Sequence, residues 1–144
     1  MIGKCLCGEV EFEIEGTVPS LYQCHCSLCQ KQGGSTSNTG TIVPLGNFRW
    51  LKGEQKVTTY RRKTGFSSFF CSVCGSPVPN PLRDSDYCWI PAGLLEGSEN
   101  LKIVMHIYTA SKADWDTIPP QGQHFEEMPD LETFNKILNH NEPI

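Results

Sequence analysis

The sequence lacks an apolar run long enough to cross a membrane or to act as a signal peptide. No stretch approaches the ~20 consecutive apolar residues of a membrane-spanning helix, and residues 1–5 do not begin a secretory signal. These absences predict a soluble protein without a membrane partner and favour the cytoplasm as its location. The chain of 144 residues has the size of one domain, so we expect a single domain over residues 1–144.

A basic excess is also missing. The formal net charge of −4 argues against a nucleic-acid partner, because such proteins usually carry an excess of Lys and Arg. The charge is uneven, since six of the 12 Lys and Arg residues lie between Arg49 and Lys63. This segment could steer a small anion, or it could be the solvated face of a hairpin.

Helical periodicity is scarce, and short strand patterns dominate. Residues 9–15 alternate strictly, with Val10, Phe12 and Ile14 on one face and glutamates on the other, which is typical of a half-buried strand. Further strands are expected at Leu21–Cys24, Gly40–Val43, Phe48–Leu51, Lys56–Arg61, Ser67–Cys71, Tyr87–Pro91 and Lys102–Tyr108. Short helices are expected at Cys26–Gln32 and Asp130–Asn139. The sequence therefore predicts a mainly β fold with little helix.

Cysteine is abundant, and its placement is the strongest signal in the chain. Seven of the eight cysteines form three tight clusters, which are Cys5-Leu6-Cys7, Cys24-His25-Cys26-Ser27-Leu28-Cys29 and Cys71-Ser72-Val73-Cys74. Disulfides are the alternative interpretation, but a bond within a Cys-x-Cys pair would close a very small, strained ring. In a reducing compartment, clustered cysteines are more often metal ligands.

The outer two clusters fit one closed zinc site. Structural zinc is commonly held by two ligand pairs on separate turns, and Cys5 and Cys7 with Cys71 and Cys74 provide such pairs. A bend at Gly8 would turn the first pair away from the strand that follows it. We expect this zinc to join distant segments and its removal to unfold the protein.

The middle cluster supplies three thiolates, Cys24, Cys26 and Cys29, within six residues. Two candidates could close this site: His25, which an extended backbone would direct away from its neighbours, and Cys88, which also fits a small core residue. With the fourth position open, three thiolates would weaken the power of zinc to acidify water. Such a site suits a substrate thiol, which it would hold as a thiolate nucleophile for a small electrophile such as an aldehyde.

Three motifs together resemble a known family. Lys4-Cys5-Leu6-Cys7-Gly8-Glu9-Val10-Glu11-Phe12, Cys24-His25-Cys26-Ser27-Leu28-Cys29-Gln30-Lys31 and Phe70-Cys71-Ser72-Val73-Cys74-Gly75-Ser76-Pro77 are similar to segments of the glutathione-dependent formaldehyde-activating enzyme (GFA) family. Ala92-Gly93-Leu94-Leu95 and the run from His106 to Trp115 also resemble it. The resemblance covers nearly the whole chain and depends on a specific order of cysteine motifs.

The resemblance implies a tent-like, mainly β fold of zinc-stabilised antiparallel sheets, with two zinc ions in one GFA-like domain over residues 1–144. It implies a structural zinc on Cys5, Cys7, Cys71 and Cys74, and a catalytic zinc on Cys24, Cys26 and Cys29. The family's named enzyme condenses glutathione with formaldehyde to S-hydroxymethylglutathione, which is carbon–sulfur lyase chemistry in reverse. The expected partners are accordingly a small thiol such as glutathione and a small aldehyde.

Two hypotheses for function follow. The first is a zinc-dependent carbon–sulfur lyase or thiol-adduct enzyme, in which the three-cysteine site has an open position. The second is a non-catalytic zinc scaffold that binds a protein partner, in which Cys88 or another residue closes that site.

Overall fold

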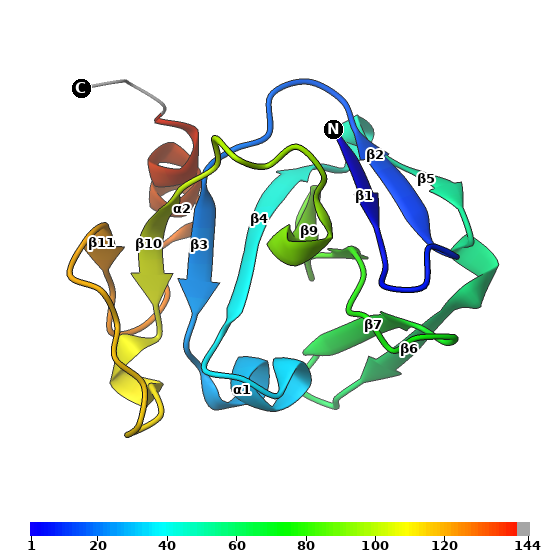
Figure 1. Ribbon diagram of the computed structural model, residues 1–144. Helices are drawn as coiled ribbons and strands as arrows, with labels where there is room; N and C mark the ends of the chain where they lie inside the picture. Colours follow the sequence, from blue (N-terminus) through cyan, green and yellow to red (C-terminus); the bar gives the residue numbers. More distant parts are fainter. Residues whose placement is uncertain (141–144) are drawn as a thin grey trace. The chain divides into compact units, whose positions relative to one another are not determined.

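The computed structural model describes residues 1–140, and its chain forms two compact units. Unit 1 comprises Met1–Val18 and Ile42–Asn100, and unit 2 comprises Pro19–Thr41 with the chain from Leu101 onward. Strand makes up 35% of the structure and there are two α-helices, so the prediction of a mainly β fold is confirmed (Figure 1). No helix within residues 1–140 is both long and apolar enough to span a membrane. The single domain over residues 1–144 stays a prediction.

Unit 1 consists of short antiparallel pairs of strands. Its strands are β1 (Ile2–Lys4), β2 (Glu11–Ile14), β5 (Phe48–Lys52), β6 (Val57–Arg61), β7 (Ser67–Cys71), β8 (Asn80–Pro81) and β9 (Tyr87–Pro91). Strand β2 lies between β1 and β5, while β6 pairs with β7 and β8 with β9. Three short 3₁₀ turns connect them, at Leu45–Asn47, Glu54–Lys56 and Ala92–Leu94.

The core of unit 1 contains the apolar side chains of the alternating segment at residues 9–15. Val10, Phe12 and Ile14 are at most 1% exposed. The ring of Phe12 packs against Phe48 and Trp50 of β5, at centroid distances of 5.7 and 6.5 Å. Burying these large apolar side chains supplies the main driving force for pairing β2 with β5.

Unit 2 contains the three strands β3 (Leu21–Cys24), β10 (Ile103–Ile107) and β11 (Gln123–His124). Its helices are α1 (Ser27–Gly33) and α2 (Leu131–Asn139), and Thr109–Ser111 forms a 3₁₀ turn. Strand β4 (Asn38–Pro44) pairs with β3 through Asn38–Gly40 and continues into unit 1.

The pairings of β10 depart from the expectation of purely antiparallel sheets. Strand β10 runs parallel to both β3 and β11, whereas β3 and β4 are antiparallel. Parallel neighbours need a long connection, and most of the chain separates β3 from β10. This pairing brings the end of β3, which carries Cys24, beside the end of β10 at Ile107.

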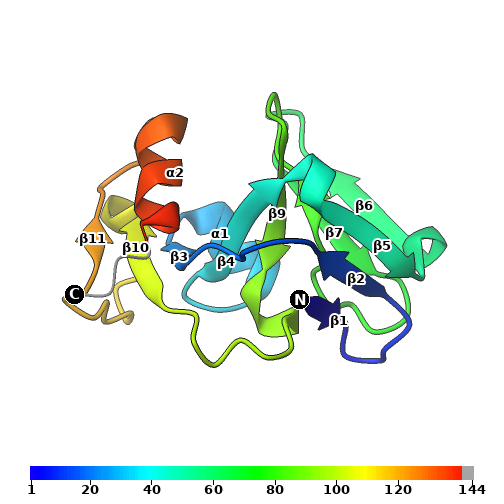
Figure 2. The same ribbon diagram turned by 90° about the horizontal axis from the view of Figure 1, so that it is seen from above.

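Helix α2 begins at a capping aspartate and covers one side of β3 and β10 (Figure 2). The carboxylate of Asp130 accepts a hydrogen bond from the main-chain N–H of Thr133, as an N-cap does. Phe134 and Leu138 are buried, and Phe134 meets Tyr22 of β3 edge to face. Strand β3, which ends at Cys24, is therefore packed against α2 through Tyr22.

Candidate metal centres

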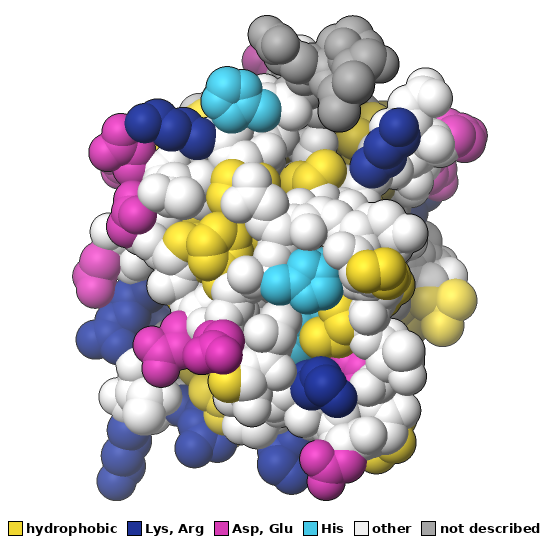
Figure 3. Space-filling model, turned by 90° about the vertical axis from the view of Figure 1, so that its left-hand side faces the viewer, with side chains coloured by type: hydrophobic (Ala, Val, Ile, Leu, Met, Phe, Trp, Pro, Cys, Tyr) yellow, Lys and Arg dark blue, Asp and Glu magenta, His cyan; other side chains and the backbone are white. Residues whose placement is uncertain are grey.

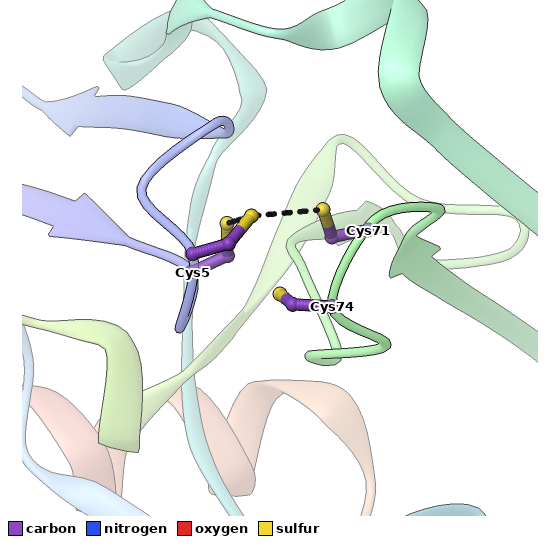
Figure 4. A group of neighbouring side chains, drawn as sticks. Cys5, Cys71 and Cys74 are labelled. Carbon is purple, nitrogen blue, oxygen red and sulfur yellow. Dashed lines mark hydrogen bonds between the residues drawn. The ribbon is translucent and has the colours of Figure 1, made fainter.

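The four cysteines of the outer clusters converge within unit 1. Each of their sulfur atoms lies within 4.8 Å of the others, and Figure 4 shows Cys5 facing Cys71 and Cys74 across the space between two loops. The sulfur of Cys7 lies 3.6 Å from that of Cys5 and 3.8 Å from that of Cys71. A tetrahedron of thiolates at ~2.3 Å from zinc has edges of about 3.8 Å. The four cysteines thus fit a zinc ion, and their spacing is much too wide for disulfides.

Main-chain turns shape this four-cysteine group. Gly8 and Gly75 follow the two cysteine pairs with φ of 78° and 79°, which other residues rarely adopt. Gly75 N–H donates to the carbonyl of Cys71 at 2.8 Å, and Val10 N–H donates to the sulfur of Cys5 at 3.3 Å. The expected bend at Gly8 is therefore present, and the sulfur atoms of Cys5 and Cys7 converge with those of Cys71 and Cys74.

The pKa values of two of these four cysteines are shifted in opposite directions. Hydrogen bonds from the hydroxyl and main chain of Ser76 lower the pKa of Cys74 to about 5. Although the main chain of Glu9 favours the thiolate of Cys7, burial and hydrogen bonds with the other cysteines raise its pKa to about 12. Adjacent thiolates repel one another, so a bound cation would favour the ionised form of Cys7.

The second group lies in unit 2, on a single turn. Cys24 ends β3, Cys26 caps the N-terminus of α1, and Cys29 lies in the first turn of that helix. The three sulfur atoms lie within 4.8 Å of one another, and Cys24 and Cys29 are buried. The sulfur of Cys26 accepts a hydrogen bond from Cys29 N–H at 3.4 Å. These three residues could hold a second metal ion.

One negative charge is already favoured in this three-cysteine group. Hydrogen bonds from Cys24 and Cys29 and from main-chain N–H groups lower the pKa of Cys26 to about 2. The hydrogen bond with Cys26 raises the pKa of Cys24 to about 12, and the pKa of Cys29 is raised by the same close contacts. A divalent cation would relieve this repulsion, so the donor set suits a soft metal such as zinc.

His25 does not join this group, although it lies between two of its cysteines. Its ring is 2% exposed, with Nδ1 3.1 Å from the carboxylate of Asp116 and Nε2 3.0 Å from Nδ1 of His106. Burial lowers the pKa of both histidines. Both ring nitrogens of His25 are thus engaged, which agrees with the expectation that the side chain points away from its neighbours.

Cys88 belongs to neither group formed by residues 1–140. It lies in β9, is 1% exposed, and its thiol donates to the carbonyl of Trp89 at 3.7 Å. Burial raises the pKa of this thiol to about 12. These surroundings are those of a small core residue.

A shallow hollow adjoins the histidines of unit 2. It has a volume of about 500 Å³, and its lining residues are Thr109, Lys112, Asp116, Thr117, Ile118 and His124. Figure 3 views this face, where histidine, lysine and acidic side chains lie around the depression. Asp116 connects the hollow to His25, and the ring of His124 lies 5.0 Å from that of His106, tilted by 51°.

Tyr108, in unit 2, lies near these cysteines and has an unusual backbone conformation. It follows β10 with φ of 55°, a left-handed conformation that is costly for an aromatic residue. Burial, followed by the charges of the three cysteines, raises the pKa of its phenol. A polar side chain thus stays close to the three-cysteine group at some cost in backbone strain.

The spacing of the cysteines predicts both groups, but it does not predict the residues that hold the second one. Asp116 and Gln30 have no local pattern that marks them. The side-chain amide of Gln30 donates to the carbonyls of His25 and Ser111 at 2.8 and 3.0 Å. The available signal is indirect: a histidine expected to be buried must find polar partners somewhere.

Comparison with known proteins agrees with this arrangement. A family model described as "Glutathione-dependent formaldehyde-activating enzyme" matches residues 1–111. The chain is also similar to a Rhodobacter sphaeroides protein of known crystal structure, with 28% sequence identity and a TM-score of 0.58. That similarity covers 67% of this chain and 89% of the other. The matched family segment contains all seven clustered cysteines.

Proposed function

Because this chain belongs to the glutathione-dependent formaldehyde-activating enzyme family, we propose that it is a zinc-dependent carbon–sulfur lyase or thiol-adduct enzyme. Its substrates are a small thiol, such as glutathione, and a small aldehyde. Cys5, Cys7, Cys71 and Cys74 hold the structural metal, and Cys24, Cys26 and Cys29 hold the catalytic one. The observation that carries this proposal is the difference in ligand number between the two groups, four sulfur atoms against three.

Cys24, Cys26 and Cys29 would hold the zinc ion, which would supply the positive charge that favours the ionised form of a substrate thiol near neutral pH. In the reaction, the S–H bond of the thiol breaks, its sulfur bonds to the carbonyl carbon as the C=O π bond breaks, and the oxygen takes up a proton that replaces the one the thiol released. The product is an S-hydroxyalkyl adduct, and the reverse reaction is a carbon–sulfur lyase step.

The chain's own residues orient this site. Cys26 lies at the start of α1, where main-chain N–H groups of Leu28 and Cys29 face its sulfur and favour the ionised form. Burial of Cys24 and Cys29 keeps water away from two sides of the group.

The hollow beside His25 supports the same proposal. Its wall includes Asp116, whose carboxylate is one hydrogen bond away from the residue between Cys24 and Cys26. Lys112 lies in the same wall and provides a cation for a carboxylate of the thiol substrate.

The scaffold hypothesis has less support. It needs a fourth ligand for the three-cysteine group, and the candidates were His25 and Cys88. The ring nitrogens of His25 already have partners, and the thiol of Cys88 is directed to the carbonyl of Trp89. No observation favours a protein partner over a small substrate.

Exchange spectroscopy with ¹³C-labelled formaldehyde and glutathione tests the function. The zinc-loaded protein is expected to raise the rate of S-hydroxymethylglutathione formation above the uncatalysed rate. Cys26→Ser should abolish the increase, because it removes a proposed ligand. Cys88→Ala, which alters a buried cysteine outside both groups, should retain it. Equal rates with and without protein, for glutathione and for other thiols, would contradict the proposal.

A further inference from the structure

His25, which lies between two of the three cysteines, is held by hydrogen bonds to both its ring and its main chain. Its ring makes two buried hydrogen bonds, from Nδ1 to Asp116 at 3.1 Å and from Nε2 to Nδ1 of His106 at 3.0 Å. Its main-chain N–H donates to the carbonyl of Ile107 at 3.0 Å, and its carbonyl accepts from Gln30 at 2.8 Å. Every polar group of this residue therefore has a partner.

These hydrogen bonds have one consistent direction. An ionised carboxylate only accepts, so Nδ1 of His25 donates to Asp116. Nε2 of the neutral ring then accepts, and Nδ1 of His106 is the donor. The ring is held in one tautomer and one orientation by partners 91 and 81 residues away in the sequence.

Holding His25 in place matters because this residue lies between two of the three cysteines. His25 shares a peptide group with Cys24 on one side and with Cys26 on the other, so holding the residue restricts the backbone conformations open to both cysteines. A local turn with three cysteines would otherwise explore many conformations, and metal binding would have to oppose that loss of entropy.

The cost of burying Asp116 and the two histidines also supports a positioning role. Asp116 has a side chain 10% exposed, and both histidines are 2% exposed. Burying a charged carboxylate contributes little net stability, because desolvation offsets the attraction of its partners. These hydrogen-bonded side chains instead fix the geometry of the adjoining turn.

We propose that Asp116 and His106 are positioning residues of the three-cysteine metal site, which act through the two ring nitrogens of His25 to hold Cys24 and Cys26 in ligand geometry before the metal binds. The inference rests on the proposed function only in its assignment of a metal to these cysteines. Residues that orient metal ligands typically contribute 10–100-fold to metal affinity, and a loss near the lower limit is expected for partners that act through another residue.

The test compares the zinc affinity of Asp116→Ala with that of Asp114→Ala, using competition with a chromophoric chelator. Both substitutions remove one acidic group from the same segment, but Asp114 is exposed. Asp116→Ala should weaken zinc binding at Cys24, Cys26 and Cys29 about tenfold. Asp114→Ala should leave it unchanged, and neither should alter affinity at the four-cysteine site.

Conservative variants separate positioning from folding. Asp116→Asn keeps a carbonyl acceptor for His25 and should retain most of the affinity. His106→Asn keeps a donor near the place of Nδ1 and should also retain it, whereas His106→Leu should lose about as much as Asp116→Ala. If Asp116→Ala does not fold, the two His106 variants give the same comparison.

The outcomes distinguish this inference from the proposed function. Unchanged affinity in Asp116→Ala and His106→Leu, or an equal loss at both metal sites, overturns the positioning role. A tenfold loss at the three-cysteine site, in a protein that forms no thiol adduct, supports the positioning role and contradicts only the function. A wild-type chain that binds no metal on these three cysteines overturns both.

Discussion

The two cysteine groups differ in how their ligands are spread along the chain. In unit 1, Cys7 and Cys71 are 64 residues apart, whereas Cys24 and Cys29 in unit 2 belong to one turn. A metal that joins distant segments closes a long loop and stabilises the folded chain strongly, and a metal on one turn closes almost none. Metals of identical chemistry are therefore expected to contribute very differently to stability.

The groups also differ in what holds them. Glycine turns and main-chain N–H groups shape the four-cysteine group, which shares the core of unit 1 with Val10 and Val78. The three-cysteine group depends on a side-chain network through His25. On the proposed function, the first arrangement would maintain the fold, and the second would orient a local turn for chemistry.

Replacing one ligand in each group should give the largest difference. Cys71→Ser removes a ligand that is fully buried in the core of unit 1, and its loss should cost about 10 kcal/mol, the scale of a structural zinc site. That loss is comparable with the whole stability of a domain. The expected result is a chain without a cooperative thermal transition, measured by circular dichroism.

Cys29→Ser is the matched variant in the other group and should retain the fold. We expect a change in unfolding free energy within about 2 kcal/mol, together with the loss of one zinc ion per chain. Chemical denaturation and elemental analysis measure the two quantities. A thermal transition lost as completely as in Cys71→Ser would remove the distinction between the groups.

A smaller effect is expected from the glycine turn of the four-cysteine group. Gly75→Ala places a side chain at φ of 79°, which should cost about 1–2 kcal/mol in unfolding free energy and weaken zinc binding in unit 1. Gly97→Ala is the control, because Gly97 has φ of 71° and open space around it. It should lose similar stability without loss of metal affinity, and equal affinity in the two variants would contradict the role of the turn.

The smallest effect concerns the start of α2, away from both groups. Hydrogen bonds from the hydroxyl and N–H of Thr133 lower the pKa of Asp130. Because this pKa is lowered, the capping interaction is fully present at pH values above the ordinary pKa of an aspartate. It is lost as the pH falls through the pKa of the folded state.

NMR of the Thr133 amide against pH measures this effect. Its shift should change with a midpoint below that of an ordinary aspartate. Asp130→Asn should keep the cap and abolish the titration. A midpoint at or above the ordinary value would show that the cap does not favour the ionised form.

Much of the fold is predictable because alternation and turn residues act locally. The burial of Val10, which precedes β2, and of Phe12 and Ile14 within it follows from strict alternation, and β3, β7 and β9 have their predicted bounds. Strand β1 and the two-residue strands β8 and β11 are too short to carry a pattern. They exist because neighbouring segments offer them hydrogen-bonding partners.

The candidate sites also have one part that the sequence predicts and another that it does not. Cysteine spacing predicts which sulfur atoms meet, since each cluster is confined to a few residues. The partners of His25 are different, because Asp116 and His106 reach it through the parallel pairing of β3 with β10 and the turn that follows. No local pattern in the sequence specifies that pairing.

Cobalt substitution at Cys24, Cys26 and Cys29, followed by absorption spectroscopy during addition of glutathione, tests the central claim most directly. An open position predicts a new sulfur-to-cobalt charge-transfer band that saturates with the thiol and is absent in Cys26→Ser. A spectrum unchanged by glutathione or any other thiol, in protein with cobalt bound at these three cysteines, would contradict the account and favour a closed, non-catalytic site.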